Sequence, residues 1–154
     1  MAKQYWLVKS EPDVYSIDQL KKDGHTTWNG VRNYQARNFM RDGMKLGDGV
    51  LFYYSSCDVP AIVGQAEVSK AGCPDPTQFD KKSEFYDPSS KPDKPTWIMV
   101  EIKYVKTFGR PLTLTELKTI KSLENMVLLK RGRLSVQPVS PEEWKIILGL
   151  TSKG

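Results

Sequence analysis

The chain has 154 residues, of which 39% are hydrophobic and 27% are charged, and its formal net charge is +5. This composition excludes a disordered chain, and the length suits one domain with a real core, which we expect to span residues 1–154. The mildly basic charge permits a polyanionic partner without requiring one.

The chain begins with a predicted strand and a short helix. Residues 5–10 combine aromatic and β-branched side chains, which is typical of a strand. Ser16 can cap a helix over residues 17–23, because its hydroxyl can accept a hydrogen bond from a helical N–H that has no other partner. Gly24 follows the last residue of this helix and is expected to end it.

Residues 28–39, with the sequence WNGVRNYQARNF, combine an Asn-Gly pair with aromatic rings and two arginines. Asn and Gly both tolerate positive φ, so this pair predicts an ordered loop over residues 28–32. Asn33 then caps a predicted helix over residues 34–40. A loop that enters a helix N-terminus beside an aromatic plane suits a flat polar ligand attached to a phosphate. The alternative is that Trp28 is simply core and the arginines are solvated.

Three strands and one long segment fill the middle of the chain. Residues 50–55 are almost all apolar and predict a buried strand, and residues 61–71 alternate loosely at period two. Residues 73–95 are rich in Pro, Asp, Ser and Lys, so they predict a long surface segment, in which residues 78–85 can form a helical turn. Residues 96–108 give the longest strand signal in the chain.

Two helical pieces are expected next, over residues 116–121, capped by Thr115, and over residues 123–129. The strand 134–139 and a last helix over residues 141–148, capped by Ser140, complete the chain. About five strands are therefore mixed irregularly with short helices, which predicts an α+β fold with a curved, mostly antiparallel sheet or barrel.

Common catalytic and metal motifs are absent from the sequence. It contains no P-loop, G-x-G-x-x-G, H-E-x-x-H or G-x-S-x-G pattern. Cys57 and Cys73 match no metal-ligand spacing, and His25 is the one histidine, so we expect reduced thiols, no metal and no cofactor. The N-terminus has no apolar run that would suit a signal peptide, so we expect a cytoplasmic location, and a monomer is favoured.

Aromatic residues near strand ends suggest a nucleic-acid site. Each base stacked on an aromatic ring can contribute on the order of 1–3 kcal/mol, and neighbouring polar groups can read a base edge. The basic cluster at residues 130–133 can grip phosphates without reading sequence. Each feature also has an ordinary interpretation, as core aromatics and as a solvated turn.

Five motifs in order resemble the EVE-domain family of the PUA-like superfamily: YWLVKSEP, WNGVRNYQARN, GDGVLFYYSS, W-x-x-V-x-I and LLKRGRLSVQPV. The resemblance extends from Tyr5 to Leu148. It implies one PUA-like domain, a curved mixed or antiparallel β-barrel of about five strands with short peripheral helices. It also implies a non-enzymatic reader of a modified base, most of all a modified cytosine such as 5-methylcytosine in DNA, or a base in RNA. YTH domains, which hold a methylated adenine, are similar in fold.

The resemblance further implies which residues form the site. The base-binding pocket should be lined by Trp28, Asn29, Val31, Arg32, Tyr54, Ser55, Ser56, Trp97, Leu134 and Ser135. The mouth of the pocket should carry Lys9, Ser10 and Glu11. The phosphate contacts should come from Arg32, Lys130, Arg131 and Arg133.

Two other functions remain open at this point. Related ASCH domains include small amidohydrolases that act on a modified nucleoside, and Lys9 and Glu11 with Ser10 or Ser56 are the corresponding candidates here. The second alternative is a protein-interaction adaptor that uses residues 73–95.

Overall fold

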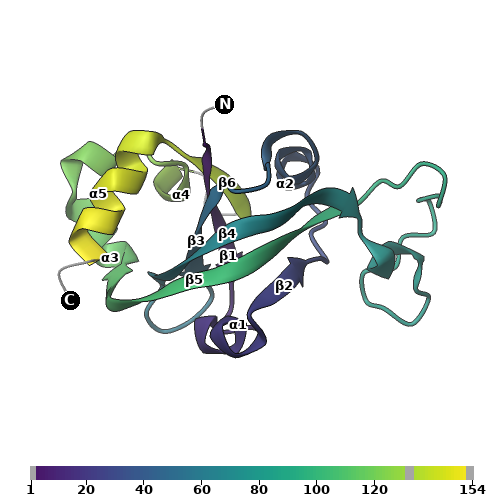
Figure 1. The fold of residues 1–154 in the computed structure, drawn as a ribbon, viewed down its shortest axis with the longest axis horizontal. Helices are drawn as coiled ribbons and strands as arrows, with labels where there is room; N and C mark the ends of the chain where they lie inside the picture. Colours follow the sequence, from purple (N-terminus) through teal and green to yellow (C-terminus); the bar gives the residue numbers. More distant parts are fainter. Residues whose placement is uncertain (1–2, 131–133, 152–154) are drawn as a thin grey trace.

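The computed structural model describes residues 3–130 and 134–151, and a sheet of order β2-β5-β4-β3-β1-β6 forms its centre (Figure 1). β1 and β3 are parallel neighbours, and the other neighbouring pairs are antiparallel. The predicted mixed, mostly antiparallel sheet is therefore confirmed. The strands are β1 (Tyr5–Ser10), β2 (His25–Trp28), β3 (Gly49–Tyr54), β4 (Ala61–Pro74), β5 (Ile98–Thr113) and β6 (Val136–Val139).

The sheet curves because its two longest strands, β4 and β5, do not pair in uniform register. Register shifts occur at several points of this pair, one of them between Ile62 and Gly64. Bulges of this kind bend a strand and increase its twist. Gly64 also lets α1 (Ile17–Asp23) approach the sheet, since a Cβ at Gly64 would lie 2.7 Å from the Ile17 side chain.

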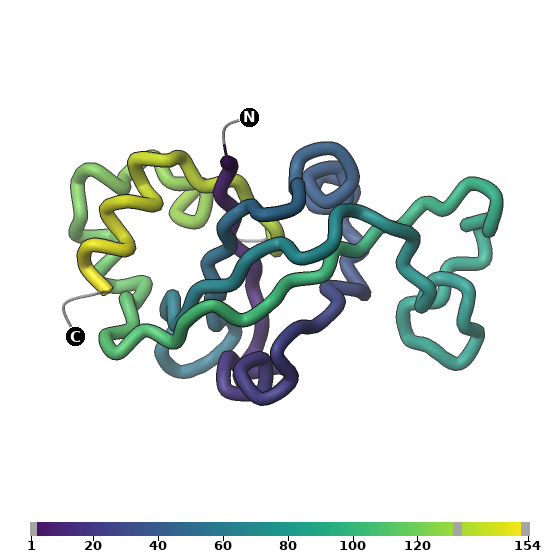
Figure 2. Tube along the Cα trace, viewed as in Figure 1, coloured from purple at the N-terminus to yellow at the C-terminus, as the bar shows by residue number. Residues whose placement is uncertain are grey.

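Short helices surround the sheet, as expected. In Figures 1 and 2, α3, α4 and α5 gather at one end of the sheet, and the segment 75–97 extends from the opposite end. We call this segment the excursion. No helix in the described parts of the chain has the length and apolar character that crossing a membrane requires. The helices are α1 (Ile17–Asp23), α2 (Tyr34–Asn38), α3 (Leu114–Thr119), α4 (Val127–Lys130) and α5 (Pro141–Thr151).

Two apolar clusters hold the sheet from either side. One packs α1 and α2 on the sheet and includes Leu20 and Phe52, and the other packs α3–α5 and includes Leu51 and Ile147. All four side chains are fully buried. Burying one such side chain contributes about 1.5–3 kcal/mol, so these clusters fix the strands whose ends carry the site.

Three of the predicted helix caps, Ser16, Asn33 and Ser140, are confirmed. Ser16 accepts a hydrogen bond from the Gln19 N–H at 3.0 Å. At α5 the capping box is complete, because the Glu143 N–H donates to the Ser140 hydroxyl and the Ser140 N–H donates to Glu143. A side chain next to the backbone it caps is a local signal, so the sequence alone reveals it.

Other boundaries were wrong. The strand β2 was missed, because its polar residues carry no apolar alternation, and it forms by pairing with β5. Thr113, not Thr115, caps α3. Because β5 continues through Pro111 to Thr113 and leads directly into the helix, α3 begins two residues earlier than expected. α5 continues past Gly149 to Thr151.

Candidate functional site

A cavity of about 860 Å³ opens where β1 and β3 end. Its walls come from these strand ends, from β2, from the loop before α2 and from residues 84–85 of the excursion. The lining residues are Lys9, Ser10, Glu11, Val14, Tyr15, Thr26, Thr27, Trp28, Asn29, Gly30, Val31, Arg32, Ser55, Ser56, Glu84, Phe85 and Ser135.

Backbone hydrogen bonds fix the strand ends in this wall. The Ser55 N–H donates to the Ser10 carbonyl at 2.9 Å, so pairing continues past the end of β3. The Lys9 N–H donates to the Ser135 carbonyl at 3.0 Å. The Ser10 hydroxyl donates to the Tyr15 carbonyl at 2.7 Å. Side chains at these positions are therefore presented by a rigid sheet.

Ser56 stands out in this wall because its φ is +52°. Among the described residues other than glycine, it is the one with positive φ. A non-glycine residue in this region costs on the order of 1–3 kcal/mol, and such strain is concentrated at functional sites. Ser56 places its strain directly in the cavity lining.

Trp28 ends β2 and provides the large aromatic ring of the cavity. It pairs in the sheet with Val100. Its ring meets the buried Phe52 ring almost perpendicularly, with the centroids 5.6 Å apart. The ring remains partly exposed, so it is anchored on one side and open to a ligand on the other.

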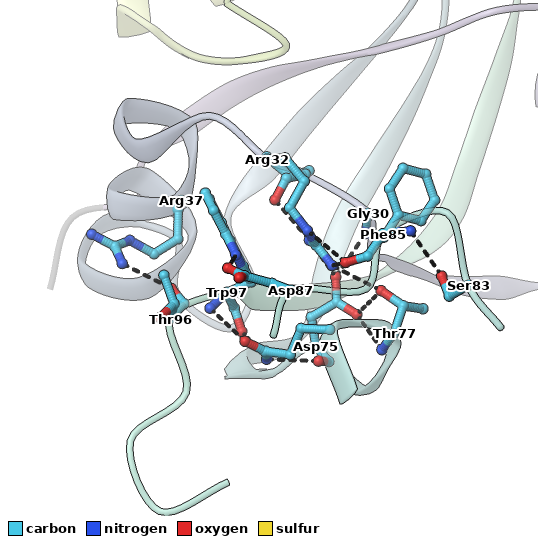
Figure 3. Close-up of polar contacts among 12 residues, drawn as sticks. Gly30, Arg32, Arg37, Asp75, Thr77, Ser83, Phe85, Asp87, Thr96 and Trp97 are labelled. Atoms are coloured by element: carbon cyan, nitrogen blue, oxygen red, sulfur yellow. Dashed lines mark hydrogen bonds and ion pairs between the residues drawn. The ribbon is translucent and has the colours of Figure 1, made fainter. Parts of the chain in front are cut away.

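The excursion is tied to the loop before α2 by a buried carboxylate (Figure 3). Asp75, whose side chain is fully buried, accepts hydrogen bonds from the Gly30 N–H at 2.7 Å and from Arg32 at 3.1 Å. Burial raises the pKa of Asp75, but hydrogen bonds from Thr77, from the Gly30 N–H and from Arg32 outweigh it and hold this pKa below its usual value. The carboxylate therefore stays ionised and keeps the two segments together.

The Arg32 guanidinium donates all of its hydrogen bonds to other groups of the protein. Its nitrogens donate to the carbonyls of Val31 and Phe85, to Asp75 and to the Thr77 hydroxyl. These bonds occupy all five N–H groups of an arginine. The expected phosphate contact of Arg32 thus has no donor left in this structure, and the side chain instead joins the two sides of the cavity.

Aromatic contacts reinforce the same junction. The Arg32 guanidinium lies 5.4 Å from the Phe85 ring centroid and 5.2 Å from that of Trp97. A Cβ on Gly30 would come within 2.8 Å of the Phe85 ring, so glycine is required for this close approach. The excursion thereby delivers Phe85 to the cavity as a second aromatic ring.

The excursion itself is held by a buried amide. Gln78 is fully buried and donates to the carbonyls of Asp75 and Trp97 at 2.7 and 2.8 Å. Its side-chain oxygen accepts from the Ser90 hydroxyl and from the Trp97 N–H. The expected irregular segment 73–95 begins later than predicted, because β4 continues to Pro74, and its helical turn lies at Pro76–Phe79 and not over residues 78–85. Polar contacts give the rest of the segment a defined shape.

Three expected pocket residues lie outside the lining, each with a partner elsewhere. Trp97 is buried, packs 4.9 Å from the Tyr34 ring and donates its Nε1–H to Asp87. The Tyr54 hydroxyl accepts from the Ile17 N–H at 2.9 Å. Leu134 belongs to the apolar core. The remaining expected pocket and mouth residues line one cavity.

Several lining residues were missed by sequence reasoning: Val14, Tyr15, Thr26, Thr27, Gly30, Glu84 and Phe85. Phe85 carried a usable signal, because an aromatic residue in a polar surface segment needs something to pack against. Thr26 and Thr27 lie in β2, so they were missed together with that strand, and neither residue carried a signal of its own.

The basic residues are distributed unevenly around the site. Lys9 is half-buried at the cavity, and this burial lowers its pKa. Lys130 is exposed at the end of α4. Arg131 and Arg133 lie outside the described residues. No cluster of metal-ligating side chains occurs within residues 3–130 and 134–151.

The cavity can bind a flat polar molecule. In the described chain, the side chains of Asn29, Ser55 and Ser56 make no hydrogen bond to protein, so they can serve a ligand. Together with the rings of Trp28 and Phe85 they combine stacking surfaces with hydrogen-bonding groups, which is how proteins hold a single base.

Known proteins are closely similar to this chain. The sequence model of the EVE domain matches residues 4–150. Human thymocyte nuclear protein 1 is 44% identical over 97% of this chain and 74% of its own length. The structure of human THYN1 in complex with DNA containing 5-methylcytosine superimposes with a TM-score of 0.93, at 44% identity and 99% coverage of both chains. A hypothetical protein from Leishmania major gives 0.94, at 46% identity over 99% of this chain and 96% of that one.

A more distant likeness concerns the fold alone. An ASCH protein from Zymomonas mobilis shares 13% identity at a TM-score of 0.57, covering 97% of this chain and 100% of the other. At this identity the likeness carries no activity from one protein to the other.

The relatives' names contradict the expected cytoplasmic location. The human and mouse relatives are both named as nuclear proteins. The expectation rested on the lack of a recognisable targeting segment, and that lack does not determine a compartment, so the expectation was wrong.

Proposed function

This chain belongs to the EVE-domain family, and we propose that it binds DNA carrying 5-methylcytosine and holds the methylated base in the cavity at the ends of β1 and β3. The observation that carries this proposal is the human THYN1 complex with 5-methylcytosine-containing DNA, at 44% identity over nearly the full length of both chains. The family resemblance found in the sequence leads to the same ligand.

The size and chemistry of the cavity support a base as its occupant. Its volume of about 860 Å³ lies within the roughly 300–1,000 Å³ that small-molecule sites occupy. A base in a duplex must leave its stack to enter such a pocket, at a cost of a few kcal/mol. Stacking on Trp28 and hydrogen bonds to the base edge offset this cost.

Each part of the lining then has a role in binding. Trp28 stacks on the base, and the side chains of Asn29, Ser55 and Ser56 contact its polar edge. Lys9 meets a phosphate at the mouth of the cavity. Phosphates further along the DNA are bound by Lys130, Arg131 and Arg133. Arg32 positions the wall that contains Phe85.

The proposed role is binding without turnover. Bound DNA in the related human protein supports this assignment, and the ASCH likeness is too distant to support an amidohydrolase. A second function is therefore not proposed.

A binding comparison with one variant tests the proposal. The wild type should bind a duplex with one central 5-methylcytosine more tightly than the unmethylated duplex, and the difference should survive an increase in salt, because phosphate contacts alone are weakened by salt. Trp28→Ala should remove this preference, with a loss of about 1–3 kcal/mol for one stacked base. Fluorescence anisotropy at two salt concentrations measures both effects, and an RNA of the same sequence tests the nucleic-acid type.

Tyr86→Ala is the matched control. Tyr86 is an exposed aromatic residue next to Phe85, but it does not line the cavity. This variant should keep the preference for methylated DNA. A Trp28→Ala protein that is folded and still prefers the methylated duplex would contradict the assignment of the cavity.

A further inference from the structure

The charges around the cavity suit a neutral ligand that donates hydrogen bonds. The acidic and basic side chains of the lining are Lys9, Glu11, Arg32 and Glu84. Arg32 is paired with Asp75, so the lining presents two carboxylates and one further cation. Carboxylates repel a phosphate and accept hydrogen bonds without donating them. The cavity therefore favours a base edge that carries N–H groups.

This chemistry matters because two DNA bases carry a methyl group at the same position. Thymine has a 5-methyl group as well, so an apolar contact with the methyl group cannot separate it from 5-methylcytosine. The bases differ at position 4, where cytosine has an amino donor and thymine has a carbonyl acceptor. A carboxylate accepts a hydrogen bond from the cytosine amino group and repels the thymine carbonyl oxygen.

Glu11 is the carboxylate that stands on the rigid wall. It directly follows Ser10, whose carbonyl accepts from the Ser55 N–H, so Glu11 is next in register to the Ser55–Ser56 turn. Its own carbonyl accepts from the N–H groups of Val14 and Tyr15 at 2.9 Å each. Glu84, the other carboxylate of the lining, lies in the turn that carries Phe85 and not on the sheet.

From this placement we infer that Glu11 is the residue that distinguishes 5-methylcytosine from thymine, by accepting a hydrogen bond from the exocyclic amino group. The inference rests on the proposed function, since it names the part of that site that reads the base edge. Ser55 and Ser56, on the same wall, face the remaining polar atoms of this edge.

Binding to two matched duplexes tests the inference. Each duplex carries either 5-methylcytosine or thymine at one position opposite an abasic site, so neither base has a pair to break on leaving the stack. The wild type should prefer 5-methylcytosine by about ten- to a hundred-fold, as expected for one good edge contact. Glu11→Gln should reduce this ratio to about threefold or less, because the amide can donate to the thymine carbonyl as well as accept from cytosine.

The controls separate the possible failures. Glu124→Gln changes an exposed carboxylate outside the cavity and should leave the ratio unchanged. An unchanged ratio in Glu11→Gln would overturn the inference, and so would a collapse of the ratio in Glu84→Gln instead. A wild type that prefers methylated to unmethylated cytosine yet binds thymine equally well would overturn the inference and leave the proposed function standing. A wild type with no preference for methylated DNA would remove both.

Discussion

The two walls of the cavity are built on different physical principles. The wall that contains Glu11, Trp28 and Ser55 stands on the curved sheet, whose strands are fixed by apolar clusters on both sides. The excursion wall contains Phe85 and is held mainly by polar contacts, among them the Asp75–Arg32 pair and the buried Gln78, with the rings of Phe85 and Trp97 against the Arg32 guanidinium. One site therefore combines a wall built on the apolar core with a wall held by a small number of polar contacts.

Removal of the buried Asp75 carboxylate should have the largest effect on the difference in stability between the two walls. Asp75→Ala leaves Arg32 and the Gly30 N–H without their buried acceptor, which costs roughly 3–5 kcal/mol when one partner of a buried pair is lost. We expect the excursion to detach while the sheet persists, because Asp75 contributes to no apolar cluster. Hydrogen exchange should show lost amide protection in the excursion and retained protection in β1, β3 and β4.

Two variants complete this experiment. Asp93→Ala, at an exposed aspartate of the same segment, should change little. Leu20→Ala, in the core, should cost about 2–5 kcal/mol and lower the protection of the whole sheet. Equal loss of protection in both walls for Asp75→Ala would show that the walls unfold as one unit. This result would contradict the difference between them.

Acid should affect the excursion wall before it affects the sheet. Because folding lowers the pKa of Asp75, its contribution to stability is fully present above the unfolded pKa of about 4 and is lost as the pH falls through the folded value. We expect excursion amides to lose protection on acidification below about pH 4, and Asp75→Asn to abolish this pH dependence. A wild-type excursion that keeps its protection at low pH would argue against the ionised Asp75 as its anchor.

The smallest effect concerns the strained residue of the sheet wall. Ser56→Gly should raise the free energy of unfolding by about 0.5–1 kcal/mol, because glycine adopts positive φ without strain but has more freedom to lose on folding. The same change removes a hydroxyl from the cavity and should weaken binding of methylated DNA by about two- to tenfold. Chemical denaturation and anisotropy measure the two effects.

Ser122→Gly is the matched control for Ser56→Gly. Ser122 lies in an exposed 3₁₀ turn outside the cavity, so glycine there should cost about 0.5–1 kcal/mol and leave binding unchanged. A Ser56→Gly protein that is less stable, or that binds as tightly as the wild type, would show that the strain at Ser56 does not serve binding.

The sequence predicted the sheet wall well because its signals are local. Apolar runs marked β1 and β3, and the Asn-Gly pair marked the loop before α2. The family resemblance added the residues at the strand ends, most of which line the cavity. The strand β2 was the exception, since its residues become a strand only by pairing with β5, far along the chain.

The excursion wall could not be predicted because its contacts are non-local. Asp75 and Arg32 are 43 residues apart, and Arg32 and Phe85 are 53 apart. No periodic pattern connects such residues, and a segment rich in Pro, Asp and Lys has the composition of a loop. This is also why Arg32 was assigned to a phosphate and Trp97 to the pocket, when both serve to hold the excursion in place.

In the proposed complex, both walls of one cavity enclose the methylated base. Hydrogen exchange of the wild type bound to a methylated duplex, compared with the unmethylated duplex, measures whether both walls enclose the base. We expect additional protection in the methylated complex at the loop before α2, at residues 55–56 and at residues 84–85, with no change in α5. Additional protection confined to α4, or none in either wall, would contradict it.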